Sequence, residues 1–212
     1  MSDLSYLRER GYLPAGGYVS AAGDFYLNIP KNASTFLSNV FRENGWHHYS
    51  LTDYHKREVK RCIVVMRDPI ERWISGFATY ASSWLLGEGY GSDHFVEDYN
   101  ALTERIIFDT VVFDDHTTPQ TAFINQLSEQ PEVVFFKLND RLINQLSQFT
   151  AQELVVGQVD NNDSENNYDQ RQISKFIRQR VDNDPSLKAK IIKAYQDDFL
   201  LLNGVRFYYE PR

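Results

Sequence analysis

The sequence has 212 residues, which is enough for one domain with a sizeable core. Hydrophobic residues make up 42% and charged residues 24%, as is typical of soluble globular proteins. The formal net charge of -7 argues against non-specific nucleic-acid binding, which requires a basic surface, so we expect no nucleic-acid partner. The single cysteine, Cys62, excludes an internal disulfide and a cysteine-based zinc site.

Two further segment types are missing from the sequence. No apolar run reaches the roughly 18 residues that a membrane-spanning helix needs. The first residues also lack the apolar core of a signal peptide. We therefore expect a cytoplasmic protein without a membrane span, and the sequence does not indicate an oligomeric state.

The first predicted elements alternate between strand and helix. Apolar alternation predicts a strand at 24–29, and a helix at about 34–44 follows it. A less regular strand is expected at 46–51. The unbroken apolar run at 62–66 is typical of a parallel strand buried on both faces. It leads into a helix at about 69–84, which starts with a helix-capping pattern around Pro69.

The second half of the sequence continues this alternation. In chain order we expect a glycine-rich loop at 87–93, a helix near 94–108, a strand at 132–138, a helix from about 140, a polar surface loop at 159–172, and helices near 169–182 and 186–202. Such alternation predicts an α/β fold with a mostly parallel sheet. Ligands of such sheets bind beyond the carboxyl ends of the strands.

The turn after the first predicted strand has the composition of an anion-binding site. A strand that passes directly into a helix directs unpaired backbone N–H groups and the positive end of the helix dipole at one point. Lys31 adds a full charge, Ser34 and Thr35 add hydroxyl donors, and the small Ala33 allows close approach. The alternative is a loop with a solvated lysine. The Walker A pattern of phosphate-binding loops is absent.

A second charged turn follows the buried strand at 62–66. Arg67 ends this strand, where a charge is costly unless it is paired. Ser75 lies two turns into the next helix, so the two residues could hold a second anionic group. The alternative is that Arg67 pairs with Asp68 or Glu71 and has a structural role.

Both turns resemble motifs of one family. The segment "IPKNASTFL" resembles the 5′-phosphosulfate loop of sulfotransferases, and "VVMRDPIERWISGF" is similar to their 3′-phosphate motif. The membrane-type carbohydrate sulfotransferase branch has both motifs in much this form. Three weaker segments resemble the same branch: "DHTTPQTAFINQL" its H-x-x-P-Q segment, "DNNDSE" its N-x-S turn, and "AYQDDFLLLNGV" its Y-x-x-D-[FY] helix. The resemblance extends discontinuously from about residue 24 to residue 204.

The resemblance implies a three-layer α/β/α sulfotransferase fold related to the P-loop NTPases. It implies one domain, 1–212, with a donor-binding core at about 24–86 and acceptor, lid and C-terminal helical elements at about 87–212. The donor would be 3′-phosphoadenosine 5′-phosphosulfate (PAPS), with adenosine 3′,5′-bisphosphate (PAP) as product. The acceptor would be a hydroxyl group on a carbohydrate or a small molecule, and no metal would be required.

By position, the residues around the 5′-phosphosulfate would be Lys31, Asn32, Ala33, Ser34 and Thr35, with Lys31 bridging toward the leaving oxygen. Arg67 and Ser75 would hold the 3′-phosphate. Many relatives have glycine where this chain has Ala33, and alanine costs little there if its φ is negative. We expect no N-terminal membrane anchor of the kind that these carbohydrate sulfotransferases carry.

Transfer to a hydroxyl also needs a base, and a neutral histidine is suited to this role. His48 and His116 are the leading candidates, and the weaker ones are His47, His55 and Asp53. For His94, a structural role is the better interpretation. His47 and His48 would point to opposite faces of a strand, which is unsuitable for chelating a metal.

Two other functions remain open. The chain could be a non-catalytic module that binds PAPS or PAP, and this interpretation gains if His47, His48 and His116 all point away from the donor. A P-loop-type kinase is less favoured, because no magnesium-binding motif is evident. For the acceptor, Tyr80, Trp84 and Tyr90 could form an aromatic wall or could equally pack in the core.

Overall fold

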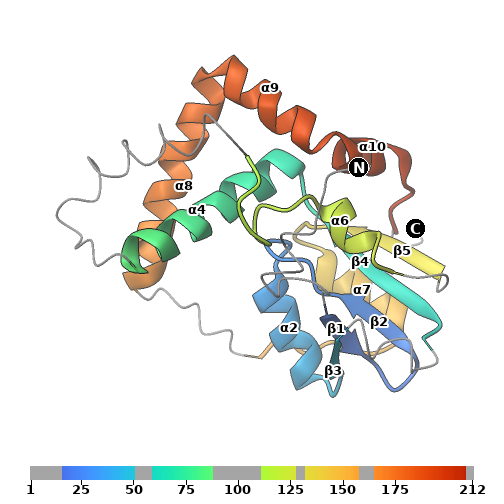
Figure 1. The fold of residues 1–212 in the computed structure, drawn as a ribbon. Coiled ribbons are helices and arrows are strands. Elements are labelled where there is room, and N and C mark those ends of the chain that lie inside the picture. The colour runs from blue at the N-terminus through green and yellow to red at the C-terminus, as the bar shows by residue number, and fades with distance from the viewer. Residues whose placement is uncertain (1–15, 51–58, 88–110, 128–131, 158–164, 209–212) are drawn as a thin grey trace.

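The computed structural model describes residues 16–50, 59–87, 111–127, 132–157 and 165–208. In this part of the chain, five strands form one sheet in the order β3-β1-β2-β4-β5 (Figure 1). The strands are β1 (Gly16–Val19), β2 (Asp24–Leu27), β3 (His47–Ser50), β4 (Arg61–Met66) and β5 (Glu132–Lys137). The helices are α2 (Ser34–Glu43), α4 (Pro69–Gly87), α6 (Gln120–Ile124), α7 (Leu142–Thr150), α8 (Glu165–Asn183), α9 (Pro185–Ala194) and α10 (Gln196–Gly204).

The α/β class is confirmed, but the sheet is mixed. Strands β2, β4 and β5 pair in parallel, as expected, whereas β1 pairs antiparallel with both β2 and β3. The mostly parallel sheet is therefore correct only for β2, β4 and β5. The sequence prediction missed β1 because "GGYV" has neither apolar alternation nor strand-forming residues at its start. A Cβ at Gly17 would lie 1.9 Å from the carbonyl oxygen of Tyr26, so this close strand pairing requires glycine.

Helices cover both faces of the sheet. Along β4, Ile63 and Val65 face a cluster with α2 and α7, whereas Cys62, Val64 and Met66 face a cluster with α6 and α10. The side chains of residues 62–66 are all at most 1% exposed, which confirms the strand predicted to be buried on both faces. The two clusters fix the sheet between two layers of helix, and the carboxyl ends of β2 and β4 lie side by side.

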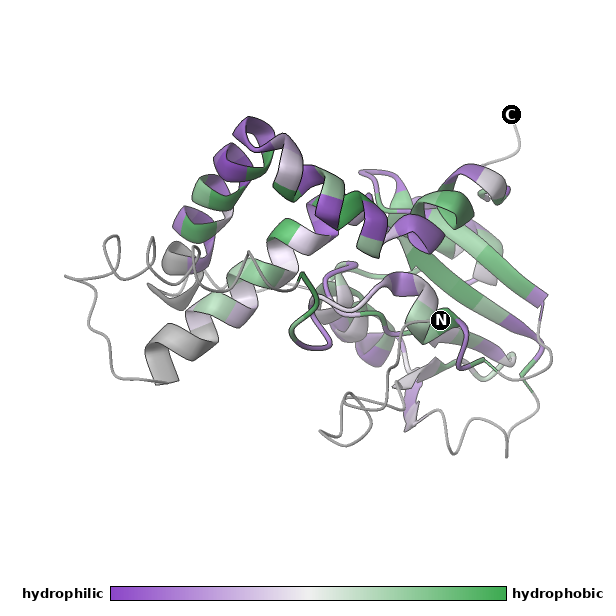
Figure 2. Cartoon of the chain, turned by 45° about the horizontal axis from the view of Figure 1, so that its top comes forward, coloured by the Kyte–Doolittle hydropathy of each residue, from purple (hydrophilic) through white to green (hydrophobic). Residues whose placement is uncertain are grey.

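The helices α4, α8 and α9 form a separate apolar cluster that extends beyond the sheet (Figure 1). Both α8 and α9 alternate hydrophilic and hydrophobic positions along their length (Figure 2). The surface loop expected at 159–172 is wrong from Glu165 onward, where α8 begins. Its first turns are polar, and the helix is recognisable only from Ile173 and Ile177, which pack against α4. The single helix expected at 186–202 is two helices that meet at Tyr195.

Some predictions remain untested by this structure. The glycine-rich loop at 87–93, apart from the end of α4, and the helix at 94–108 lie outside the described residues. None of the described helices has the length and apolar character that crossing a bilayer demands. The cytoplasmic location and the single-domain organisation stay predictions.

Candidate functional site

The turn between β2 and α2 is tightly folded around two non-glycine residues in the left-handed region. Lys31 has a φ of 68° and Ala33 a φ of 60°. The expectation of a negative φ at Ala33 is therefore wrong, and each such residue costs about 1–2 kcal/mol. Ala33 is the N-cap residue of α2 and has no side chain that could cap the helix. The N–H groups in the first turn of α2 can therefore donate hydrogen bonds to an anion at this turn.

The left-handed conformation of Ala33 makes a substitution to glycine informative. We expect Ala33→Gly to raise the free energy of unfolding by about 0.5–1 kcal/mol, because relief of the strain exceeds the entropic cost of glycine. Chemical denaturation measures this change. Ala151→Gly, at another left-handed position with a φ of 52°, should give a similar gain. Destabilisation by Ala33→Gly alone would contradict a left-handed conformation at this turn.

The Lys31 side chain crosses from this turn to α4. Its Nζ donates a hydrogen bond of 2.7 Å to the Thr79 hydroxyl, one turn beyond Ser75 on the same side of the helix. Burial lowers the pKa of Lys31, and the neighbouring charges of Arg67 and Arg72 lower it further. Three cationic groups thus gather where β2 and β4 end, which makes this position strongly attractive to an anion.

Arg67 contacts the lysine turn. Its Nη1 donates to the backbone carbonyl of Lys31 at 3.0 Å. The two acidic residues considered as its partners have other bonds: Asp68 accepts from the backbone N–H groups at the start of α4, and Glu71 pairs with Arg178. The contact therefore joins the two charged turns that the sequence placed at strand ends.

The side chains of Asn32 and Gln120 stabilise the contact between the two charged turns. Asn32 is fully buried, and its Nδ2 donates to the carbonyl of Val65 and to Gln120 Oε1, both at 2.7 Å. Gln120 also bonds both backbone polar groups of Arg67, accepting from its N–H at 3.0 Å and donating to its carbonyl at 2.9 Å. In this conformation Asn32 supports the turn, and it has no surface to offer an anion.

The C-terminal helices complete this support. The carboxylate of Asp198, fully buried on α10, accepts hydrogen bonds from both backbone N–H groups at the start of α6 and from the side chains of Gln120 and Thr121. The Tyr195 hydroxyl donates to the carbonyl of Thr117. The sequence alone did not indicate a role for Asp198 or Gln120. An acidic residue within the apolar segment "DFLLL" was the available signal.

Arg72 was also missed, although it is the second arginine of the "RDPIER" segment. It is fully buried and donates to three backbone carbonyls, those of Pro30 at 3.0 Å, Thr118 at 2.5 Å and Asp115 at 3.4 Å. Burial lowers its pKa, and the negative charges of Asp198 and Asp115 oppose that shift. Arg72 therefore connects the lysine turn to the loop that precedes α6.

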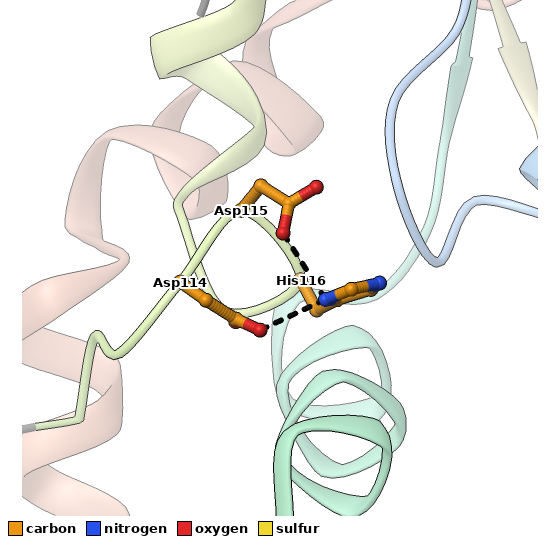
Figure 3. A group of neighbouring side chains, drawn as sticks. All are labelled: Asp114, Asp115 and His116. Carbon is orange, nitrogen blue, oxygen red and sulfur yellow. Dashed lines mark hydrogen bonds and ion pairs between the residues drawn. The ribbon is translucent and has the colours of Figure 1, made fainter. Parts of the chain in front are cut away.

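That loop packs directly on α4 and carries His116. A Cβ at Gly76 would lie 2.2 Å from the carbonyl oxygen of His116, so only glycine permits this approach. The Nδ1 of His116 lies 2.8 Å from a carboxylate oxygen of Asp114 and 3.1 Å from one of Asp115 (Figure 3). Arg72 joins this loop to the lysine turn by donating to the carbonyls of Asp115 and Pro30, and the charges of both carboxylates oppose the lowering of the pKa of Lys31.

His116 is protonated, whereas a general base must be neutral to accept a proton. Burial lowers its pKa, but the hydrogen bonds and charges of Asp114 and Asp115 raise it, to about 9 in total. At pH 7 the ring is therefore mostly a cation and has no lone pair to accept a proton. This protonation state disfavours the expected role of His116 as general base.

Asp114, Asp115 and His116 have ligand atoms within 4.8 Å of one another, as a metal site would require. Two observations weigh against that use. The Asp114 carboxylate already accepts from the backbone N–H and the hydroxyl of Thr117, and a protonated imidazole does not bind metal. A function without a metal stays the prediction.

The histidines on β3 lie elsewhere. In the sheet, β1 lies between β3 and β2. The Lys31 side chain extends instead to Thr79 on α4, the helix that follows β4. His48 is exposed and its ring contacts Tyr18, with 5.3 Å between the ring centroids. His47 lines a pocket of about 340 Å³ with Gly23 and Lys60, at the end of β2 opposite the lysine turn. The structure therefore brings neither histidine to the Lys31 side chain.

The expected acceptor wall is described only in part. Tyr80 stacks on Phe113 with 5.1 Å between the ring centroids and also lies beside Phe77, so it packs against the apolar helical cluster. Tyr90 and the side chain of Trp84 lie outside the described residues. The same holds for three other residues considered at the sequence level, Asp53, His55 and His94.

The fold and the site together define an α/β protein with a cationic site where two neighbouring parallel strands end. No family model, no curated protein and no solved structure matches the chain. The similarity to sulfotransferases therefore rests on the sequence motifs, and we take it further only as a proposal.

Proposed function

We propose that this chain is a PAPS-dependent sulfotransferase that transfers the sulfuryl group to a hydroxyl acceptor on a carbohydrate or a small molecule. The observation that carries the proposal is the contact between its two predicted donor motifs. Arg67 of the 3′-phosphate motif donates to the carbonyl of Lys31 in the 5′-phosphosulfate motif, although 36 residues separate them. In this proposal the chain belongs to the P-loop-like sulfotransferase fold.

The proposed reaction forms a bond between the acceptor oxygen and sulfur, and breaks the bond between sulfur and the 5′-phosphate oxygen. Negative charge then develops on the leaving oxygen. The Lys31 ammonium, with the N–H groups at the start of α2, would stabilise this charge at a desolvated position. Thr79 holds the Lys31 side chain at 2.7 Å before a donor binds, so the ammonium is already oriented.

The 3′-phosphate would be held by Arg67 and Ser75. Ser75 lies one helical turn before Thr79 on α4, so it shares the side of the helix that Lys31 approaches. Gln120 fixes the backbone of Arg67 on both sides and therefore orients the guanidinium. Two cationic side chains with different partners, Lys31 at Thr79 and Arg67 at the carbonyl of Lys31, suit a nucleotide with phosphates at both its 3′ and its 5′ position.

A second candidate is a module that binds PAPS or PAP without catalysis. The placement of the histidines favours it, because His116 is protonated at neutral pH and His47 and His48 lie on the edge strand. Measuring sulfuryl transfer from labelled PAPS to panels of glycan and phenol acceptors separates the two candidates. Binding of PAP without any transfer would favour the module.

Ligand binding tests the assignment of Arg67. PAP should raise the melting temperature of the protein more than AMP at equal concentration, because AMP lacks the 3′-phosphate. In Arg67→Ala, PAP should lose about tenfold or more in affinity while AMP changes little, because a charged hydrogen bond contributes about 1.5–3 kcal/mol. Calorimetry measures both affinities.

Arg42→Ala serves as the control, because Arg42 is an exposed arginine on α2 bonded to Asn39. It should leave both affinities unchanged. If Arg67→Ala weakens the two nucleotides equally, Arg67 is structural. If PAP stabilises the wild-type protein no more than AMP does, the donor assignment itself is wrong.

A further inference from the structure

We propose that His116 is an anion ligand of the donor site, an imidazolium cation whose Nε2–H donates to an oxygen of the bound sulfuryl or phosphate group. This inference rests on the proposed function for the identity of the anion. It assigns to His116 the opposite role to that of a general base, since the ring gives a hydrogen bond and keeps its proton.

The geometry around Nδ1 fixes both the orientation of the ring and its charge. Two carboxylates, of Asp114 and Asp115, lie on the same ring nitrogen at 2.8 and 3.1 Å. One carboxylate would suffice to hold a neutral imidazole in one tautomer. The second adds another full negative charge beside the ring, and this favours the imidazolium. Burial of the loop keeps these charges poorly screened.

The other ring nitrogen is directed away from both carboxylates (Figure 3). In that view it points to the side where the segment between β2 and α2 passes, drawn in blue. The loop is held against α4 by the close approach at Gly76 and by the bonds of Arg72 to the carbonyls of Thr118 and Asp115. Arg72 also donates to the carbonyl of Pro30 in the lysine turn, so the loop that orients Nε2 is joined to the cationic turn through this one side chain.

The charged and titratable groups around His116 come from every element that packs on its loop. They are Asp114 and Asp115 on the loop, Lys31 on the turn after β2, Arg67 after β4, Arg72 on α4, and Tyr195 and Asp198 at the start of α10. The carboxylates of Asp114, Asp115 and Asp198 offset three of the four cations Lys31, Arg67, Arg72 and His116, so the cluster keeps a net positive charge. A bound anion would lie between Lys31 and His116 and further stabilise the charge on both.

The sign of the pH dependence follows from linkage. The pKa of His116 is raised to about 9, so the imidazolium is present below that value and is lost as the pH rises through it. An anion that binds the imidazolium must raise this pKa further. A base that accepts the proton of the acceptor would instead need a neutral ring in the bound state.

NMR of the imidazole ring tests this directly. In the full chain, His116 should titrate near pH 9 without ligand, and its pKa should rise by about one unit with saturating inorganic sulfate, corresponding to about tenfold in affinity. Assignment uses His116→Gln, in which this signal is lost. A midpoint below pH 7, or a pKa that stays constant or falls when sulfate binds, would overturn the proposal.

Binding measurements between pH 7 and pH 10 provide the second test. Wild-type affinity for PAP should fall about tenfold across pH 9, whereas His116→Gln should bind more weakly with less dependence on pH. Asp115→Asn removes one of the two carboxylates and keeps the shape, so its affinity should fall at a lower pH than in wild type. An unchanged midpoint in Asp115→Asn would count against the proposal.

Two controls separate the other contributions. Lys31→Met removes the titration of the neighbouring lysine, and the titration of His116 should still be visible by NMR. His47→Gln, at the opposite end of β2, should change nothing. If sulfate raises the pKa of His116 while PAP binds no better than AMP, the anion role of His116 holds and the sulfotransferase assignment fails. If PAP binds tightly without changing the pKa of His116, the donor assignment holds and the anion role of His116 fails.

Discussion

Lys31→Met should reduce sulfuryl transfer by about 10²–10³-fold or more, the loss typical when a preorganised transition-state donor is removed. Methionine keeps the length and the apolar part of the side chain, so the path from the turn to α4 stays filled. Under the proposed function, the substitution removes the charge that would stabilise the leaving oxygen. The rate of transfer from labelled PAPS at saturating acceptor measures the effect.

The same substitution should leave the protein as stable as wild type, or more stable. Burial and the charges of Arg67 and Arg72 lower the pKa of Lys31, which means that folding disfavours its ammonium. A lost activity with an unchanged or raised melting temperature therefore cannot be attributed to unfolding. Lys60→Met, an exposed lysine before β4, should retain full activity. If Lys31→Met transfers sulfuryl groups at the wild-type rate, Lys31 has no role in the mechanism.

Asp198→Ala should lower the free energy of unfolding by about 3 kcal/mol or more, the second large effect expected. The substitution leaves the buried N–H of Gln120 and the part-buried N–H of Thr121 without their acceptor, and each unsatisfied buried group costs about 1–3 kcal/mol. It also releases Gln120, which positions Arg67. Urea denaturation measures the stability, and calorimetry measures the affinity for PAP.

The neighbouring aspartate provides a matched control. Asp197 also lies in the first turn of α10 but is exposed, so Asp197→Ala should cost at most about 1 kcal/mol, the range of an interaction with the helix dipole. Equal losses for the two variants would contradict the role of the buried carboxylate. A large loss of stability in Asp198→Ala with undiminished PAP affinity would mean that the support from α10 does not reach the site.

The elements with strong local signals were predictable from the sequence. The apolar run at 62–66 and the capping pattern at Pro69 gave β4 and α4 nearly at their observed bounds. The strand β1 was not predictable, because its pairing with β2 depends on a close approach at Gly17 that leaves no periodic pattern. The antiparallel part of the sheet was missed for this reason.

The residues of the candidate site were likewise predictable from the sequence only in part. The sequence by itself determined which residues could contact an anion, because Lys31 and Arg67 each follow an apolar strand, and the ends of parallel strands meet at one edge of the sheet. Only the tertiary structure decided what surrounds them. Arg72, Gln120 and Asp198 act through partners between 42 and 88 residues away. The charge of His116 depends on two carboxylates oriented by the folding of its loop, and residue type and spacing do not encode that orientation.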